Sequence, residues 1–237
     1  MQFSEIKGQE NAIHILQCAI KNNHIAHAYL FTGPEGTGKK MAALALAQYL
    51  NCEAPDARTL HSCGHCPSCI QAAAGSHPDI MMLEPDGASI KIEKIRSLLS
   101  KVSLRNYESA YKVAILNDAH LMTEQAANCL LKTLEEPTDN TVFILVTAQV
   151  QNLPITILSR CQQIQFQLLP PALIQDILQQ LYPERQSQIG LMAALAKGSV
   201  HTAEELLANE EISTARQNFY QLLTKLATTT PAQIIGW

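Results

Sequence analysis

Short apolar runs alternate with longer amphipathic segments from the N-terminus to Phe166. Four runs of four or five apolar residues are too short for helices and are typical of buried strands. They lie at residues 28–31, 80–83, 113–116 and 142–146. Because buried strands that alternate with helices are the pattern of a parallel sheet, the sequence predicts a wound α/β domain.

Four segments have the spacing or composition of helices that would cover this sheet. Two are defined by apolar positions on one side, namely Ile6, Ile13, Leu16 and Ile20, and then Ile92, Ile95, Leu98 and Leu99. A third, residues 39–50, is rich in alanine and leucine. Thr123 is a predicted N-cap for the fourth, which has to end before Pro137.

The pattern changes after Phe166, where Pro170 and Pro171 introduce a stretch with helical spacing and no strand-like runs. We therefore predict a domain boundary near residue 169, with an all-helical part after it.

Composition and charge limit the class of protein and the partners that the chain can bind by itself. The chain is 47% hydrophobic and 16% charged, which is typical of a globular protein, and its net charge is −4. No basic excess is present to bind nucleic acid, so any role on DNA would be shared with partners. The N-terminus lacks the pattern of a signal peptide and the apolar runs are too short to cross a bilayer, so we expect a cytoplasmic protein with no membrane contact.

A glycine-rich loop follows the first predicted strand and opens the alanine-rich helix. Residues 33–40 match the phosphate-binding pattern G-x-x-x-x-G-K-[ST] except at Lys40, which replaces the hydroxyl residue. The candidate nucleotide-binding residues are Gly33, Gly36, Thr37, Gly38, Lys39 and Lys40. Because the Ser/Thr oxygen normally holds Mg²⁺, this loop is suited to binding ATP or ADP and lacks part of what hydrolysis needs.

A single carboxylate follows the strand at 113–116, in the order Asn117 then Asp118. If Asn117 occupies the metal-facing position, it brings no charge for Mg²⁺, which prefers anionic oxygen ligands. Asp118 either orients a water molecule or simply ends the strand, and the sequence leaves both roles open.

Four cysteines, Cys52, Cys63, Cys66 and Cys69, have the spacing C-x10-C-x2-C-x2-C. Four thiolates at this spacing predict one tetrahedral, structural zinc ion. An iron–sulfur cluster is the main alternative, and His61 or His65 could replace a sulfur. The remaining cysteines, Cys18, Cys129 and Cys161, are predicted to be buried small side chains.

Four motifs occur in this order along the chain: residues 27–31 (His-Ala-Tyr-Leu-Phe), the cysteine segment, residues 131–137 (Leu-Lys-Thr-Leu-Glu-Glu-Pro) and residues 158–161 (Leu-Ser-Arg-Cys). Together they resemble the clamp-loader subunits of the bacterial AAA+ family, over nearly the whole chain. Within that family, residues 77–85, 90–96 and 117–119 look like the delta prime branch. The alternative is the ATPase motor branch, gamma/tau.

This resemblance implies an AAA+ domain at 1–169 with a zinc module inserted at 52–69, and a helical lid at 170–207. Residues 208–237 would begin a helical collar domain that is truncated here. It implies a scaffold in the five-subunit ring of DNA polymerase III, which loads the sliding clamp on primed DNA. The partners would be gamma/tau and delta, and the chain would belong to a nucleotidyltransferase holoenzyme without itself being a DNA-directed DNA polymerase.

Residue roles also follow from the resemblance. Arg160, in the Ser-Arg-Cys motif, would be an arginine finger that reaches a neighbour's nucleotide, and Thr147 would fit the first sensor position. Where motor subunits carry a sensing arginine in the lid, this chain has residues 198–201 (Gly-Ser-Val-His). We therefore expect its own ATPase activity to be weak or absent.

Overall fold

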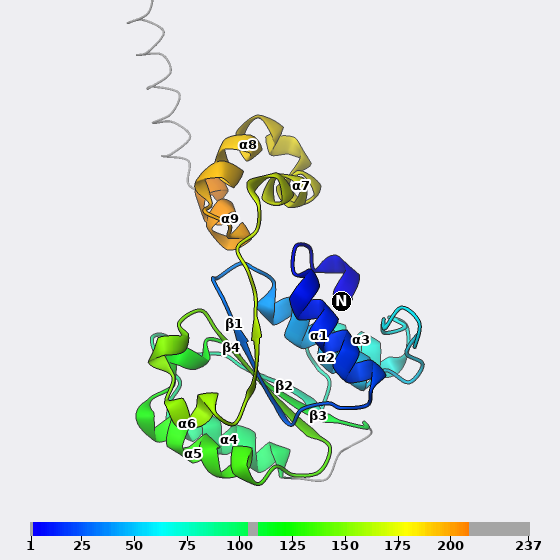
Figure 1. The fold of residues 1–237 in the computed structure, drawn as a ribbon, viewed down its shortest axis with the longest axis vertical. Helices are drawn as coiled ribbons and strands as arrows, with labels where there is room; N and C mark the ends of the chain where they lie inside the picture. The colour runs from blue at the N-terminus through cyan, green and yellow to red at the C-terminus, as the bar shows by residue number, and fades with distance from the viewer. Residues whose placement is uncertain (1, 104–108, 209–237) are drawn as a thin grey trace, which may run out of the picture. The chain divides into compact units, whose positions relative to one another are not determined.

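The computed structural model describes residues 2–103 and 109–208, and the chain divides into two compact units between Leu168 and Leu169 (Figure 1). The first unit contains a sheet and its helices, and the second is helical where it is described.

Within the described residues, the sheet of the first unit has five parallel strands in the order β2-β3-β4-β1-β5. Their bounds are β1 Ala28–Thr32, β2 Ile80–Leu83, β3 Lys112–Leu116, β4 Thr141–Thr147 and β5 Gln162–Gln165. The predicted wound α/β sheet is confirmed, and its four predicted strands are β1 to β4. The sequence did not predict β5, because it is an edge strand in which only Ile164 is buried.

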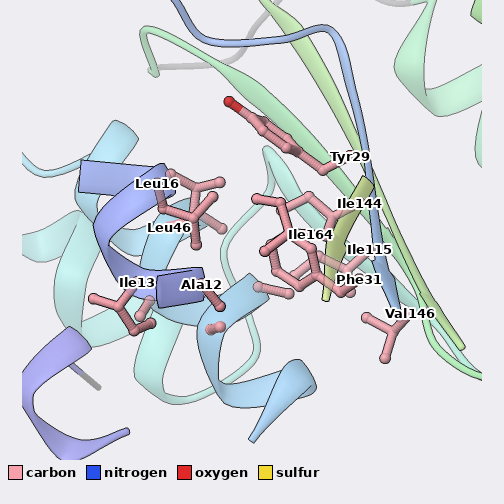
Figure 2. Close-up of a cluster of buried hydrophobic side chains, with 14 of the residues drawn as sticks. Ala12, Ile13, Leu16, Tyr29, Phe31, Leu46, Ile115, Ile144, Val146 and Ile164 are labelled. Atoms are coloured by element: carbon pink, nitrogen blue, oxygen red, sulfur yellow. The ribbon is translucent and has the colours of Figure 1, made fainter. Parts of the chain in front are cut away.

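Alternate side chains of the central strands point to opposite faces of the sheet, as the two-residue period of a strand requires. On one face, Tyr29 and Phe31 pack against α1 (Glu10–Lys21) and α2 (Lys39–Leu50), as Figure 2 shows. On the other face, Leu30 packs with helices α4 (Ile92–Val102), α5 (Glu124–Glu135) and α6 (Ile155–Leu158). Both faces are therefore covered, which explains why the strands β1, β3 and β4 read as continuous apolar runs.

The observed helices agree in part with those predicted from the sequence. Helix α2 covers the predicted residues, and Thr123 accepts a hydrogen bond from the backbone N–H of Ala126 as the N-cap of α5. The prediction that Ile6 belongs to the first helix is wrong. Ile6 ends a 3-10 turn, η1 (Phe3–Glu5), and Gly8 at φ 72° separates that turn from α1. A short helix in the cysteine segment, α3 (Pro67–Ala73), was not predicted.

Three short 3-10 turns complete the list of elements in the described residues. They are η2 (Ala119–Leu121), η3 (Val150–Asn152) and η4 (Pro183–Arg185).

The second unit contains α7 (Pro171–Leu181), α8 (Gln186–Leu195) and α9 (Val200–Ala208) around their own apolar core. Its largest buried side chains include Leu169, Ile174, Leu178, Ile189 and Met192. Except for Ala208, where α9 ends, the predicted collar segment at 208–237 lies outside the described residues. Within the described part of the chain, no helix is long and apolar enough to cross a membrane.

Candidate functional site

The glycine loop lies between the carboxyl end of β1 and the start of α2. Gly33 has φ 136°, and a Cβ atom there would lie 2.2 Å from the backbone oxygen of Phe166. Gly38 has φ 92° and is the residue before α2. These positions need glycine because of backbone conformation and, at Gly33, because another segment of backbone approaches closely.

Lys39 is buried, and its side chain folds back on its own loop. Its Nζ donates hydrogen bonds to the backbone oxygens of Gly33 and Pro34, at 2.7 and 2.5 Å. Burial lowers the pKa of Lys39 to about 8, while the nearby carboxylates of Glu35 and Asp118 oppose this shift. Thr37 is also buried and donates from Oγ1 to the Pro34 oxygen at 2.8 Å. The loop is thus held by its own side chains.

Lys40 turns away from the loop toward the end of β2. Its Nζ lies 2.6 Å from Oε1 of Glu84, and about half of each side chain is exposed. A cation paired with a carboxylate therefore stands where the phosphate-loop pattern has a hydroxyl. Sequence reasoning did not identify Glu84, because nothing in the pattern of apolar and polar positions indicates a pairing over 44 residues.

Polar residues at the carboxyl ends of neighbouring strands lie on the same edge of the sheet as the loop. Thr147 pairs with Thr32 in the register of β1 and β4 and is fully buried. Its Oγ1 lies 3.2 Å from Nδ1 of His120 and accepts a hydrogen bond from the N–H of Gln149. The structure therefore brings Thr147 close to the start of the glycine loop.

Asn117 and Asp118 lie on this edge too, directly after β3. The Asn117 side chain donates a hydrogen bond from Nδ2 to Oδ2 of Asp118, at 3.0 Å. Asp118 has φ 48°, a left-handed conformation that Asp adopts more readily than most residues. The Asp118 carboxylate acts electrostatically on Lys39 and tends to raise the pKa of that lysine.

Arg160 lies at the amino ends of the strands, opposite the carboxyl ends where the glycine loop lies. It precedes β5 by two residues, and β5 runs parallel to β1 with Gln162 beside Tyr29 and Gln165 beside Thr32. At about 3.3 Å per residue, β5 alone separates the two edges by roughly 10 Å. The Arg160 side chain is thus at the amino edge of β5, away from the glycine loop at the carboxyl edge of β1.

The Arg160 guanidinium is partly exposed in a surface groove lined by His27, Leu134, Glu135, Ser159 and Arg160. Its Nη1 donates to the backbone oxygen of Thr156 at 2.8 Å and lies 3.3 Å from Ser159 Oγ. Its Nη2 donates to Oε1 of Glu135 at 2.5 Å. The Glu135 contact was not predicted, although Glu135 lies in one of the motifs quoted above.

The four cysteines of the predicted metal site converge. Their sulfur atoms all lie within 4.8 Å of one another, and the Cys63 and Cys69 sulfurs are 3.9 Å apart. Four sulfurs around one zinc ion at about 2.3 Å would be separated by about 3.8 Å. The donors present therefore fit a single tetrahedral ion, and the cluster could hold a metal. Spacings this short suit one ion better than a cluster in which each thiolate binds a different iron.

Backbone N–H groups surround these sulfurs. The N–H groups of Cys63, Cys66 and Cys69 donate to the sulfurs of Cys52, Cys63 and Cys66, in that order. Backbone hydrogen bonds from His65 and Cys66 lower the pKa of the Cys63 thiol to about 6, whereas burial raises that of Cys69 to about 12. Neither histidine of this segment joins the converging group, and His65 Nδ1 lies 2.9 Å from the Cys63 backbone oxygen.

The other three cysteines are not part of this cluster. Cys18, Cys129 and Cys161 were predicted to be buried, but each is only half-buried. The prediction failed because their helices and strand ends lie at the margin of the core, where apolar spacing alone does not give the depth of burial.

The glycine loop follows the first strand of a parallel sheet, polar residues lie at the adjoining strand ends, and a helical unit comes after the sheet. Together these features define an α/β phosphate-loop protein of the AAA+ kind. Comparisons with known proteins specify the family. A family model described as "DNA polymerase III, delta subunit" matches residues 8–170.

Sequence relatives come from two kinds of subunit. The chain is 38% identical over 214 residues to DNA polymerase III subunit delta' of Bacillus subtilis, covering 90% of this chain and 64% of that protein. It is 35% identical over 212 residues to DNA polymerase III subunit tau of the same organism, covering 87% of this chain and 37% of that protein. The chain therefore belongs to the DNA polymerase III clamp-loader family that includes delta prime and gamma/tau subunits, and it spans less than two thirds of these relatives' lengths.

Solved structures agree with this fold. A DNA polymerase III gamma subunit-related protein from Thermotoga maritima matches with a TM-score of 0.53 and 25% identity, over 76% of this chain and 56% of that one. The RuvB Holliday junction branch migration motor of the same organism matches with a TM-score of 0.56 over 86% of this chain and 62% of that one. At 17% identity, the RuvB likeness concerns the fold alone.

Proposed function

We propose that this chain acts as a delta prime type of clamp-loader subunit. It is a scaffold in the ring that loads the sliding clamp on primed DNA in the cytoplasm, with gamma/tau and delta as its partners. Its contribution to catalysis is Arg160, which it donates to the nucleotide site of an adjacent ATPase subunit. The higher identity to delta' than to tau supports this branch of the family.

The observation that carries the proposal is the placement of Arg160 at the sheet edge opposite its own glycine loop. A guanidinium there cannot serve the phosphates of its own chain, yet its partly exposed side chain is accessible to a neighbour. An arginine supplied in trans stabilises charge on the transferring phosphoryl group and accelerates hydrolysis by about 10³ to 10⁵.

The chain's own nucleotide site supports the same conclusion. Lys40 is engaged with Glu84 and offers no oxygen to Mg²⁺, and Asn117 hydrogen-bonds Asp118 where a second carboxylate would bind metal. Binding of ATP or ADP by the glycine loop and Lys39 remains compatible with this arrangement. Hydrolysis is expected to be feeble, because nothing places the metal that neutralises the departing phosphate.

The cysteine cluster is proposed to hold structural zinc through Cys52, Cys63, Cys66 and Cys69. Four thiolates complete the tetrahedral coordination of the ion. The ion would therefore cross-link the segment and would have no open coordination position for catalysis. Gln48 of α2 donates a hydrogen bond to the Cys69 backbone oxygen at 3.3 Å, which ties the cluster to the sheet's helices.

The experiment is Arg160→Ala in a reconstituted clamp loader, with ATP turnover measured in the presence of clamp and primed DNA. We expect turnover at the adjacent site to fall by about 10³. Arg96→Ala is the matched control, because Arg96 is an exposed arginine on α4, outside the groove. Full turnover with Arg160→Ala would refute the proposal.

A second candidate is an ATPase motor of the gamma/tau type. It is favoured by the intact glycine loop and Lys39, and by the 35% identity to tau. The two functions give opposite results in the assembled loader. If Lys39→Ala abolishes ATP turnover while Arg160→Ala leaves it intact, the motor is correct.

A further inference from the structure

The guanidinium of Arg160 is held by groups from two different helices. Thr156 and Ser159 belong to α6 or its C-terminal cap, in the same short segment as Arg160 itself. Glu135 is the last residue of α5, 25 positions earlier in the chain. The carboxylate is thus the one contact among these three that fixes the side chain relative to the rest of the domain.

The backbone that carries both partners is firmly anchored. Leu134, directly before Glu135, is 1% exposed, and Ile157 of α6 is fully buried in the same core. Buried neighbours of this kind keep the start of each side chain fixed, although Glu135 and Arg160 end at the surface. The backbone positions from which Glu135 and Arg160 reach each other are therefore fixed by the core.

The contacts leave part of the guanidinium available. Arginine has five N–H donors, and the bonds to Thr156, Ser159 and Glu135 use three of them. The other two have no partner among the described residues, so they are free to meet an anion from outside. An arginine side chain that is not already held has several rotatable bonds and loses conformational entropy when it binds an anion. The three hydrogen bonds reduce that loss for Arg160.

The ion pair between Arg160 and Glu135 contributes little to the free energy of unfolding. Side-chain exposure is 32% for Arg160 and 50% for Glu135. Exposed pairs of this kind contribute little to folding, because water and salt screen them and ordering two side chains costs entropy. The effect of the contact is on the orientation of the guanidinium rather than on the fold.

We propose that Glu135 is a positioning residue that orients the Arg160 guanidinium toward the phosphate of a neighbouring subunit's nucleotide. The proposal rests on the trans role of Arg160 proposed above. Glu135 itself does not meet the nucleotide. It accepts one N–H of Nη2 and so pre-orients the remaining donors before the two subunits meet.

The test compares Glu135→Ala with Glu135→Gln in the reconstituted loader. Loss of the acceptor in Glu135→Ala is expected to lower kcat at the neighbouring site by about tenfold, with less than about a twofold change in KM for ATP. Glu135→Gln keeps an acceptor oxygen in place and should retain at least about half of kcat. Glu136→Ala is the matched control, since it removes the adjacent carboxylate outside the groove.

A double-variant cycle separates positioning from a merely structural role. With Arg160→Ala in place, Glu135→Ala should cause no further loss, because no guanidinium remains to be oriented. An equal loss with and without Arg160, or unchanged kcat in Glu135→Ala, would overturn the positioning role alone. A silent Arg160→Ala would instead overturn the trans function on which it rests.

Discussion

The ammonium group of Lys40 lies 2.6 Å from Oε1 of Glu84, directly after the loop lysine Lys39. In this position the phosphate-loop pattern supplies the hydroxyl oxygen that holds Mg²⁺. A lysine has three donors and no acceptor, so it cannot bind the ion. The loop thus keeps Lys39, but position 40 carries an ammonium group paired with Glu84 in place of a hydroxyl that could bind the metal.

Restoring the missing oxygens should strengthen metal-dependent nucleotide binding. In the variant Lys40→Thr with Asn117→Asp, a hydroxyl and a second carboxylate return to the edge of the sheet that carries the loop. We expect its affinity for ATP in the presence of Mg²⁺ to rise by about tenfold, which corresponds to about 1.4 kcal/mol.

Isothermal titration calorimetry with and without EDTA measures this gain. The control Lys40→Met breaks the pair with Glu84 but adds no oxygen, so it should show no Mg²⁺-dependent increase. A similar increase in both variants would mean that release of Glu84, and not metal binding, is responsible.

Gly33→Ala should destabilise the domain strongly. Its Cβ would lie 2.2 Å from the Phe166 backbone oxygen, at a φ of 136° that side-chain-bearing residues rarely adopt. We expect a loss of about 3 kcal/mol or more in the free energy of unfolding, measured by urea denaturation. Gly75→Ala also has positive φ, 68°, but no atom lies within 4 Å of its Cβ, and it should cost only about 1 kcal/mol. Equal losses would contradict the close approach at Gly33.

The amine of Lys39 should lose its proton near pH 8. Burial, which disfavours the charged form, lowers its pKa from 10.5 to about 8. NMR of labelled lysine side chains should therefore show one amine that titrates near pH 8, and this signal should be absent in Lys39→Met. A Lys39 signal that titrates near 10.5 would contradict the burial of the charge.

The same shift links stability to pH. Between about pH 8 and 10.5 the unfolded chain binds more protons at Lys39 than the folded chain does. The contribution of Lys39 to the free energy of unfolding should therefore rise with pH across this window. Denaturation series for the parent and Lys39→Met should diverge there, with the parent gaining relative to the variant.

Removing metal from the cysteine cluster should destabilise the first unit. Because the buried Cys69 is one of four converging sulfurs, Cys69→Ser removes one ligand, and we expect the Tm to fall by about 5 °C or more. Elemental analysis of the parent should give about one zinc per chain, since the four sulfurs fit one ion. Cys129→Ser, outside the cluster, should keep the zinc. Stoichiometric iron in the parent would refute the assignment.

Much of this protein was determined by local sequence. Of the five strands in the described residues, four were predicted because they are apolar runs. In β1, β3 and β4 the residues have to be apolar because both faces are buried, as at 113–116, whereas β2 is an apolar edge strand in which only Leu83 is buried. The glycine loop and the four cysteines were found for a similar reason, since each needs particular residue types at short, fixed spacing. Helix α5 was located by Thr123 and Pro137, which act on the backbone within one turn.

Only the tertiary structure decided which residues meet across long separations. The edge strand β5 is mostly polar and is defined by its pairing with β1, and Lys40 with Glu84 and Arg160 with Glu135 are contacts between exposed side chains. No local propensity specifies such pairs, because their free energy is small and their partners are chosen by the packing of whole elements. The parallel register likewise puts the glycine loop and Arg160 at opposite ends of the strands, and that separation is the physical basis for the proposal that the guanidinium acts on a neighbouring subunit.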